Sequence, residues 1–348
     1  MTSPLFVTRD QMLLDELLRL AAAGGVTPDV AHDGVAALRG WTGASLVLVG
    51  VDVADEVATV RPPRRDGVHV VGWGEVPNEM FRTALAIGAE NVAALPGSGA
   101  WVVESLTDVG DASPARGVTF GVVGGSGGAG ATTFACALGQ LAAQGGTAAV
   151  VDLDPLGPGI DRVLGLEASD GVRWDELCQT TGRLSARALR EALPRRVGLG
   201  VLTWTTGPHG SLQPFAVREA LSAAQRGHDV VVLDLPRMRD PLVDEVVARC
   251  DRLFVVVSPT VAGVSSAARL CAGFPDPSAL RLVVRGSGIG PRDIQRATGV
   301  PVAAAMSDQR GLAESVDLGL GPVRSRRGPL GRAVLAVLDA ERAVPVAA

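Results

Sequence analysis

The chain has 348 residues, of which 47% are hydrophobic and 20% charged, and its formal net charge is −5. This length predicts about two domains of ordinary size, and the apolar content excludes an intrinsically disordered chain. The negative charge disfavours sequence-independent nucleic-acid binding through a basic face, although it leaves a local arginine patch open. We expect no sequence-specific nucleic acid among the partners.

The cysteines and the first residues carry no metal-binding or targeting pattern. The four cysteines lie far apart and match no metal-ligand spacing, which favours free thiols in a cytosolic protein. The first residues lack a basic segment followed by an apolar one, so we expect no signal peptide. The uncharged stretch 117–151 is glycine-rich, which favours a buried strand, a loop and a buried helix over a transmembrane segment.

The N-terminal third alternates short apolar runs with helical patterns, which predicts an α/β fold with a parallel sheet covered on both faces. The predicted strands are Leu5–Val7, Thr27–Ala31, Ser45–Gly50, Val68–Trp73 and Asn91–Ala94, and the predicted helices are Gln11–Ala22, a short one from about Gly34, and Asn78–Ile87. The order and lengths resemble a response-regulator receiver domain, which is CheY-like and flavodoxin-like, over residues 1–108. The segment 109–117 is small and polar with Pro and Gly, as is typical of a linker.

The chemistry that this resemblance implies is missing from the chain. Receiver domains need an acidic pair after the first strand, a phosphoacceptor Asp at the end of the third, and a Lys after the fifth. These positions hold Thr8 and Arg9, then Gly50, then Leu95. Asp10 and Asp52 lie one or two residues away, so a different register could restore one of them, but nothing restores the lysine. We therefore expect a pseudo-receiver without a phosphorylation site that serves for docking, with a phosphorylation-controlled regulator as the weaker alternative.

The remaining residues, 118–348, predict a second α/β domain. Buried strands are expected at Val118–Val123, Ala148–Leu153, Gly198–Trp204, Val230–Leu235, Leu253–Ser258 and Leu280–Arg285, with helices at Thr132–Ala143, Ser185–Ala192, Ala216–Ala224 and Pro241–Ala248. This alternation indicates a doubly wound sheet with right-handed crossovers. A ligand of such a sheet binds at the carboxyl ends of the strands.

A phosphate-binding loop without its lysine follows the first of these strands. The pattern G-x-x-x-x-G-K-[ST] is met at every position but one by Gly125, Ser126, Gly127, Gly128, Ala129, Gly130, Ala131, Thr132 and Thr133. Ala131 replaces the lysine, and the chain contains no lysine at all, since all 32 Lys+Arg residues are arginine. The loop keeps the glycines whose amides surround phosphates and Thr132, whose hydroxyl would meet Mg²⁺. It lacks the ammonium group that reaches the β- and γ-phosphates.

Aspartates stand at the ends of two further strands. Asp152 and Asp154 follow the strand after the phosphate loop, where a carboxylate faces the γ-phosphate side and could order a water or a Mg²⁺ shell. Asp234 ends an apolar run that stops at Pro236, a position from which an Asp commonly holds Mg²⁺ through water. Taken alone, each of these aspartates is also typical of a residue that caps a turn and binds no ligand.

Together these motifs resemble the MinD/ParA ATPases. Residues 126–133 are similar to the deviant Walker A pattern K-G-G-x-G-K-T-T, Asp152 and Asp154 match switch I, and Asp234 with Pro236 matches switch II. The receiver-like domain narrows the resemblance to the CpaE/TadZ branch and to actinobacterial septum-site-determining (Ssd-type) proteins. It implies a cytosolic homodimer, ATPase-like, that positions a Flp/Tad-type pilus or secretion system or the division septum through its receiver-like domain.

The departures from the family pattern change this implication. The lysine that reaches the partner's nucleotide is Ser126, the lysine for its own phosphates is Ala131, and the Asn that reads adenine is Arg285. We therefore expect a regulator with weak or absent hydrolysis, for which ATP and Mg²⁺ are weak ligands and no cofactor is obligatory. The alternative is an active ATPase switch, cycling between monomer and dimer, in which a partner or an arginine such as Arg237 or Arg239 replaces the lysines. Both arginines also fit ordinary surface positions.

The C-terminal region begins with a basic segment. Arg324, Arg326 and Arg327 precede Pro329–Ala343, a pattern that fits the entry to an amphipathic helix. The helix is alanine-rich and carries acids that suit an anionic membrane poorly, so packing on the sheet is favoured over membrane targeting. We expect a cytoplasmic protein, with peripheral association at the inner membrane face or the septum as an open alternative.

Overall fold

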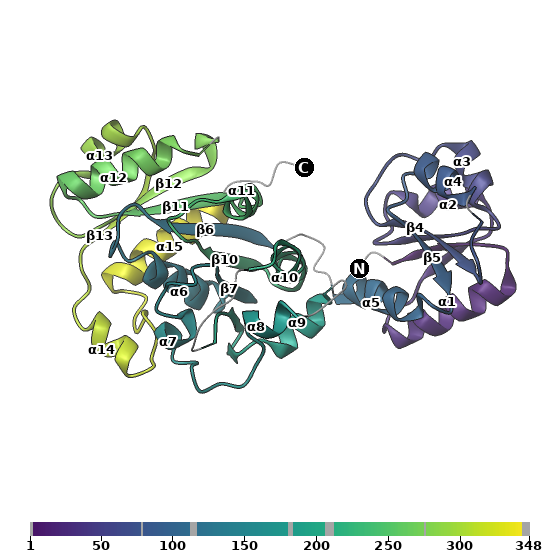
Figure 1. Ribbon diagram of the computed structural model, residues 1–348, viewed down its shortest axis with the longest axis horizontal. Helices are drawn as coiled ribbons and strands as arrows, with labels where there is room; N and C mark the ends of the chain where they lie inside the picture. The colour runs from purple at the N-terminus through teal and green to yellow at the C-terminus, as the bar shows by residue number, and fades with distance from the viewer. Residues whose placement is uncertain are drawn as a thin grey trace. The chain divides into compact units, whose positions relative to one another are not determined.

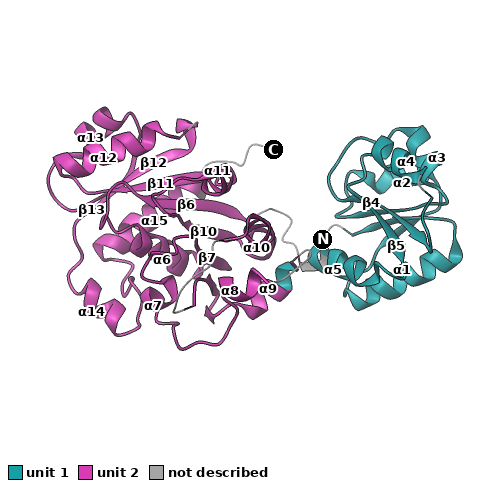
Figure 2. Ribbon diagram, viewed as in Figure 1, with its two compact units in different colours: residues 1–115, 185–187 teal, residues 116–184, 188–348 magenta. Residues whose placement is uncertain are grey.

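The computed structural model describes residues 3–77, 79–111, 117–179, 184–205, 212–274 and 276–342. They form two compact units, shown in different colours in Figure 2. Unit 1 comprises residues 1–115 and 185–187, and unit 2 comprises residues 116–184 and 188–348. Each unit has its own sheet, and the two are described separately.

Unit 1 is a five-stranded parallel sheet in the order β2-β1-β3-β4-β5. Its elements, labelled in Figure 1, are β1 Leu5–Val7, α1 Gln11–Ala23, β2 Asp29–Ala31, α2 Gly34–Trp41, β3 Val47–Gly50, α3 Ala54–Val60, β4 Val68–Trp73, α4 Met80–Ile87, β5 Asn91–Leu95 and α5 Gly99–Asp111. This strand order is that of flavodoxin-like folds. The α/β class and the receiver-like fold predicted for this region are confirmed.

Alternation along β1 fixes which helices cover each face of this sheet. Leu5 and Val7 pack in one apolar cluster with α2, α3 and α4, whereas Phe6 packs in the other with α1 and α5. All three side chains are almost completely buried. Both faces are therefore covered, as a parallel sheet requires.

The carboxyl edge of unit 1 is held by Asp52 rather than by a receiver's acidic cluster. Asp52 accepts hydrogen bonds from Thr8 Oγ1 at 2.8 Å and from the amides of Arg9 at 2.7 Å and Asp10 at 3.2 Å. Asp10 caps α1 instead, accepting from the amides of two residues in its first turn. A Cβ at Gly50, the phosphoacceptor position, would lie 2.2 Å from Asp52 Oδ1. The Asp52 carboxylate thus fills the space that a phosphorylated side chain would need.

Unit 2 is an eight-stranded sheet in the order β13-β12-β11-β6-β10-β7-β9-β8, in which only β8 runs antiparallel to its neighbour. The strands are β6 Val118–Gly124, β7 Ala148–Asp152, β8 Arg195–Arg196, β9 Leu199–Leu202, β10 Val230–Asp234, β11 Arg252–Val257, β12 Leu280–Arg285 and β13 Val302–Met306. The helices are α6 Ala131–Ala142, α7 Ile160–Leu164, α8 Trp174–Leu177, α9 Ala186–Ala192, α10 Pro214–Gly227, α11 Pro241–Val247, α12 Val261–Ala272, α13 Pro291–Thr298, α14 Leu312–Asp317 and α15 Pro329–Arg342, with the 3₁₀ turn η1 Pro277–Ala279 before β12.

Helices cover both faces of the unit 2 sheet. One apolar cluster joins the sheet to α6, α7 and α15, and the other joins it to α8 through α13. In Figure 1, α6 and α15 lie beside each other under the central strands. Leu330, Val334 and Val337 of α15 are buried in the first cluster, so this helix packs in the core, as the sequence favoured.

The structure adds elements that the sequence analysis did not predict. Strand β13 is alanine-rich and shows no clear alternation, and β8 has only two residues. Helices α3, α5, α7, α8, α12, α13 and α14 were also not predicted. Helix α5 runs past residue 108 to Asp111, while residues 112–116 of the predicted linker lie outside the described residues. No helix of the described residues is long and apolar enough to cross a membrane.

We predict that unit 1 does not accept a phosphoryl group. The Asp52 oxygens already accept three hydrogen bonds, and Thr8 and Arg9 supply no carboxylate beside it to bind Mg²⁺. Mass spectrometry after treatment with acetyl phosphate and Mg²⁺ should detect no adduct, while a functional receiver treated in parallel is labelled. A phosphoryl adduct on Asp52 or Asp10 would contradict this account of the carboxyl edge.

Candidate functional site

The phosphate loop joins the central strand β6 to the buried helix α6. Gly128 and Gly130 adopt positive φ angles of 72° and 96°, a conformation that favours glycine. Gly125 donates its amide to Val256 O at 2.8 Å, and a Cβ on it would lie 2.8 Å from Ala267 Cβ of α12. The loop therefore needs glycine both for its turns and for the close approach of α12.

The loop still offers hydrogen-bond donors. Within the described part of the chain, the amides of Gly127, Gly128 and Gly130 have no acceptor. Backbone amides at the start of a helix suit phosphate oxygens. The loop itself brings no cation, since the lysine positions hold Ser126 and Ala131, both partly exposed. The loop therefore keeps backbone donors suited to a phosphate group but supplies no positive charge to oppose it.

Two of the predicted acids are brought together at the carboxyl edge of the sheet. Asp152 ends β7 and Asp234 ends β10, and they are register partners on adjacent strands. Both are almost fully buried, with exposures of 1% and 2%. Asp154 lies beyond the end of β7 and is partly exposed. Its side chain accepts a hydrogen bond from the Leu156 amide at 3.0 Å.

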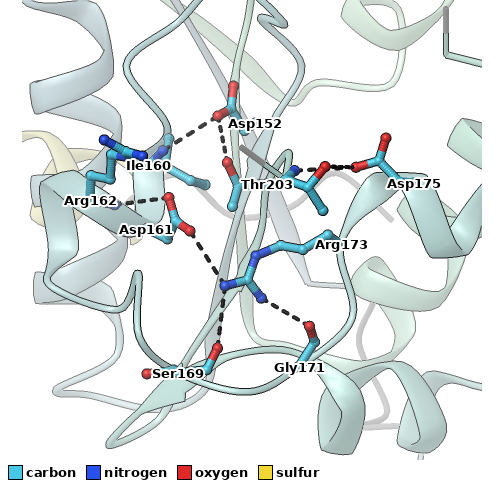
Figure 3. Close-up of polar contacts among 10 residues, drawn as sticks. Asp152, Ile160, Asp161, Arg162, Ser169, Gly171, Arg173, Asp175 and Thr203 are labelled. Atoms are coloured by element: carbon cyan, nitrogen blue, oxygen red, sulfur yellow. Dashed lines mark hydrogen bonds and ion pairs between the residues drawn. The ribbon is translucent and has the colours of Figure 1, made fainter. Parts of the chain in front are cut away.

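Asp152 accepts hydrogen bonds from several donors at the strand end, two of which are drawn in Figure 3. Thr203 Oγ1 donates to Asp152 Oδ2 at 2.8 Å, and the Ile160 amide does so at 3.4 Å. The Asp154 amide donates to Oδ1 at 3.1 Å. Burial nevertheless raises the pKa of Asp152 to about 6, against the lowering effect of the Thr203 hydrogen bond. Its carboxylate therefore organises the 152–160 loop.

Asp234 is less well satisfied. Burial, followed by the nearby Asp152 charge, raises the pKa of Asp234 to about 8, although a hydrogen bond with Thr132 opposes the shift. Among the described residues its Oδ2 is buried without a hydrogen-bond partner. An orphaned carboxylate oxygen beside a threonine hydroxyl fits a hydrated Mg²⁺ held indirectly by Thr132 and Asp234. The described residues hold no cluster of three or more His, Cys, Asp or Glu that could bind a metal alone.

Two arginines contact carbonyl oxygens near the two ends of the loop. Arg237 Nη2 donates to Gly125 O at 3.5 Å and to Ser266 Oγ at 3.1 Å. Arg285 Nη1 donates to Ala129 O at 3.4 Å, and its Nε pairs with Asp308 at 3.0 Å. Both guanidinium groups therefore donate to backbone carbonyl oxygens of the loop.

Arg239, the other arginine considered from the sequence, faces away from the loop. It pairs with Asp244 at 2.5 Å, donates to Gly273 O and stacks on Phe274 at 4.6 Å from the ring centroid. Its cation is therefore committed to α11 and to the end of α12. Of Arg237 and Arg239, the two arginines proposed from the sequence to replace the lysines, only Arg237 contacts the loop.

The space beside Gly130 and Arg285 is almost closed. The cavity lined by Gly130, Thr133, Arg285 and Gln309 has a volume of about 10 Å³, which is at the lower limit for one water molecule. A Cβ on Gly130 would lie 2.6 Å from Arg285 Nη1. This is the side on which the family resemblance places the adenine-reading residue, and in this chain the Arg285 side chain occupies it.

An ion pair that the sequence analysis missed supports the loop after β7. Arg173 and Asp161 are each 8% exposed and pair at 3.4 Å. Figure 3 shows Arg173 also reaching the carbonyl oxygens of Ser169 and Gly171, at 3.3 and 3.0 Å. The pair lines a polar cavity of about 570 Å³. Its members are 12 residues apart, with Asp161 in α7 and Arg173 just before α8, so no local spacing signals them.

We predict that Asp234 makes unit 2 less stable as pH rises. The folded protein holds this proton more tightly than the unfolded chain does, because the pKa rises from 3.8 to about 8. The free energy of unfolding should therefore fall as pH approaches 8 and level off above it. Asp234→Asn should remove most of the fall between pH 6 and 8, whereas Asp293→Asn on the exposed face of α13 should not. The measurement is urea denaturation at several pH values, with hydrogen exchange of β6 and β10 peptides as the readout. An unchanged slope in Asp234→Asn would contradict the burial argument.

Comparison with known proteins places both units. Residues 7–117 match the family described as Rv3660c-like, CheY-like N-terminal domain. Unit 2 is similar in fold to a ParA family ATPase from Chlorobium tepidum (18% identity, 63% of this chain and 96% of that chain, TM-score 0.56). It is also similar to the septum site-determining protein MinD complexed with Mg-ADP from Pyrococcus horikoshii (17% identity, 65% and 96%, TM-score 0.54). The P-loop NTPase-like fold expected for this region is confirmed.

One relative matches along almost the whole chain. The uncharacterized protein Rv3660c of Mycobacterium tuberculosis is 36% identical over 345 residues, which cover 94% of this chain and 95% of the relative. The match includes the receiver-like unit and the phosphate-loop unit together. The chain therefore belongs to the family of Rv3660c, whose N-terminal domain is described as CheY-like.

Proposed function

We propose that this protein is an ATPase-like regulatory scaffold that positions cellular machinery and hydrolyses ATP slowly or not at all. The observation that carries the proposal is a phosphate loop with free backbone donors and alanine at the lysine position. The role that fits is either septum-site determination or the localisation of a Flp/Tad-type pilus or secretion system. Within the superfamily, we place the protein in the CpaE/TadZ branch, among the Ssd-type proteins.

The electrostatics of the site support slow hydrolysis. Phosphoryl transfer concentrates negative charge on the transferred group, and a single well-placed cation is worth about 10³–10⁵ in rate, or roughly 4–7 kcal/mol. Here two buried acids, Asp152 and Asp234, stand on the same edge, and no lysine opposes them. Arg237 and Arg285 donate to loop carbonyl oxygens, so both guanidinium groups already have acceptors in the loop backbone. Thr132 and Asp234 would hold Mg²⁺, which would neutralise phosphate charge without replacing the lysine.

A working ATPase switch is the second candidate, and one observation favours it. The Arg237 contact with Gly125 O is long, at 3.5 Å, and the side chain is exposed. A rotation of this exposed side chain could bring its guanidinium over a bound phosphate. In that case Arg237, rather than Arg239, would replace the missing charge, alone or completed by a partner.

We further propose a homodimer formed across the phosphate-loop face. Residues 125–131 carry no charge, so two copies can approach without the repulsion of facing lysines. An apolar groove of about 540 Å³ lies beside the loop, with Leu156 and Met238 exposed by 91% and 82%. The receiver-like unit would then bind the positioned protein, in the cytoplasm or at the inner face of the membrane or septum.

We predict phosphate release from ATP·Mg²⁺ near background. Ala131 and Ser126 remove both cations that would stabilise the transferred group, so steady turnover should fall far below about 1 s⁻¹, the low end of ordinary enzymes. The measurement is phosphate release by the full chain, with Arg237→Gln as the variant and Arg239→Gln as the matched control.

The two candidate functions give different results. Steady turnover near 1 s⁻¹ that Arg237→Gln abolishes and Arg239→Gln preserves would refute the scaffold and support the switch. Sedimentation of the same samples gives an independent check, because the scaffold predicts a dimer with and without ATP. A monomer that dimerises only with ATP would favour the switch.

A further inference from the structure

A cavity lies between the loop after β13 and the segment that leads into α15. Its volume is about 470 Å³. It is lined by Asp308, Gln309 and Arg310 on one side and by Arg324, Ser325 and Gly328 on the other. The first group directly precedes α14 and the second leads into α15, and both helices are labelled in Figure 1. The cavity uses none of the phosphate-loop residues.

Two unpaired guanidinium groups line this cavity. Arg310 and Arg324 are exposed, and among the described residues neither has an ion-pair or hydrogen-bond partner. The one carboxylate of the lining, Asp308, is paired with Arg285 at 3.0 Å. Arg326 and Arg327 follow directly and are also exposed. A chain with net charge −5 therefore gathers exposed arginines at this place, and the carboxylate of the lining is engaged by Arg285.

The backbone that carries these arginines is well fixed. Gln140 of α6 accepts from the Val323 amide at 3.1 Å and donates to Val323 O at 3.1 Å. Ser325 O accepts from the Gly328 amide at 3.2 Å, and Ser325 Oγ accepts from the Arg327 amide at 3.2 Å. On the other wall, Gln309 Nε2 donates to Pro322 O at 3.2 Å. A fixed frame with free guanidinium groups is preorganised for a ligand, which lowers the entropy cost of binding.

We propose that this cavity binds a phosphate-bearing small molecule through Arg310 and Arg324. Guanidinium groups bind phosphate oxygens with paired hydrogen bonds. A phosphate monoester carries about −1.5 to −2 charges near neutral pH, which two guanidinium groups balance. The volume falls within the roughly 300–1,000 Å³ of small-molecule sites. The proposal does not depend on the function proposed for the phosphate loop.

The position of the cavity suggests what its ligand would affect. Asp308 lines the cavity and holds Arg285, which in turn contacts Ala129 O of the phosphate loop. An anion bound to Arg310 and Arg324 would add negative charge beside Asp308. It would therefore change the electrostatic surroundings of the Asp308–Arg285 ion pair. The site is thus next to the closed side of the phosphate loop while remaining separate from it.

The test is calorimetric titration of the full chain with inorganic pyrophosphate. The double variant Arg310→Gln/Arg324→Gln should bind pyrophosphate at least tenfold more weakly than the parent chain. Arg292→Gln removes an exposed arginine without a partner among the described residues, on α13, and should bind as the parent does. Hydrogen exchange with pyrophosphate present should show protection in 309–312 and 324–331.

Three outcomes would overturn the proposal. The first is unchanged binding in the double variant, with protection confined to residues 125–133, since the phosphate loop would then be the only anion site. The second is equal affinity for citrate, which would remove the preference for phosphate. The third is protection of 309–312 and 324–331 by duplex DNA and not by pyrophosphate, which would assign the arginines to a nucleic-acid surface.

Discussion

The burial of two carboxylates without a nearby lysine is the constraint on which the site of unit 2 depends. Asp152 and Asp234 are register partners on adjacent strands, and both are nearly inaccessible to water. Two buried negative charges repel each other strongly unless a cation or a proton neutralises one of them. In this chain the lysine position is Ala131, and the pKa of Asp234 rises to about 8. Without a bound cation, the raised pKa favours a proton on Asp234, and this proton relieves the repulsion between the two acids.

This compensation connects the loss of the lysine to the proposed function. A proton neutralises Asp234 and so preserves the fold of the carboxyl edge, but it brings no positive charge towards a bound phosphate. The glycines, the free amides and the Asp152 network keep the shape of the site. Arg237 and Arg285 donate to carbonyl oxygens of the loop, and the cavity beside Arg285 is almost closed. The result is a nucleotide-binding type of fold in which the backbone geometry of the phosphate site is retained more fully than its catalytic charges. This combination is expected of a scaffold.

Much of the fold could be predicted from the sequence because its strands are continuous apolar runs. The receiver-like and P-loop folds and the placement of Asp152 and Asp234 at strand ends follow from such runs. Strand β13 was missed because alanines carry little strand signal, and α12 because its small residues do not form a strong apolar stripe. The Arg173–Asp161 pair and the separate roles of Arg237 and Arg239 depend on long-range contacts. Such contacts leave no periodic pattern in the chain.

The direct test of this account is to restore the lysine. In Ala131→Lys the new ammonium group should oppose Asp234, lower the pKa of Asp234 and strengthen binding of ATP·Mg²⁺ at least tenfold, measured by calorimetry on the full chain. Ser126→Lys serves as the comparison, because the family resemblance directs that lysine to the partner's nucleotide. A gain in affinity with Ala131→Lys would show that the loop lacks only its cation. Unchanged affinity, with the protein still folded, would contradict the claim that the loop has kept the geometry of a phosphate site.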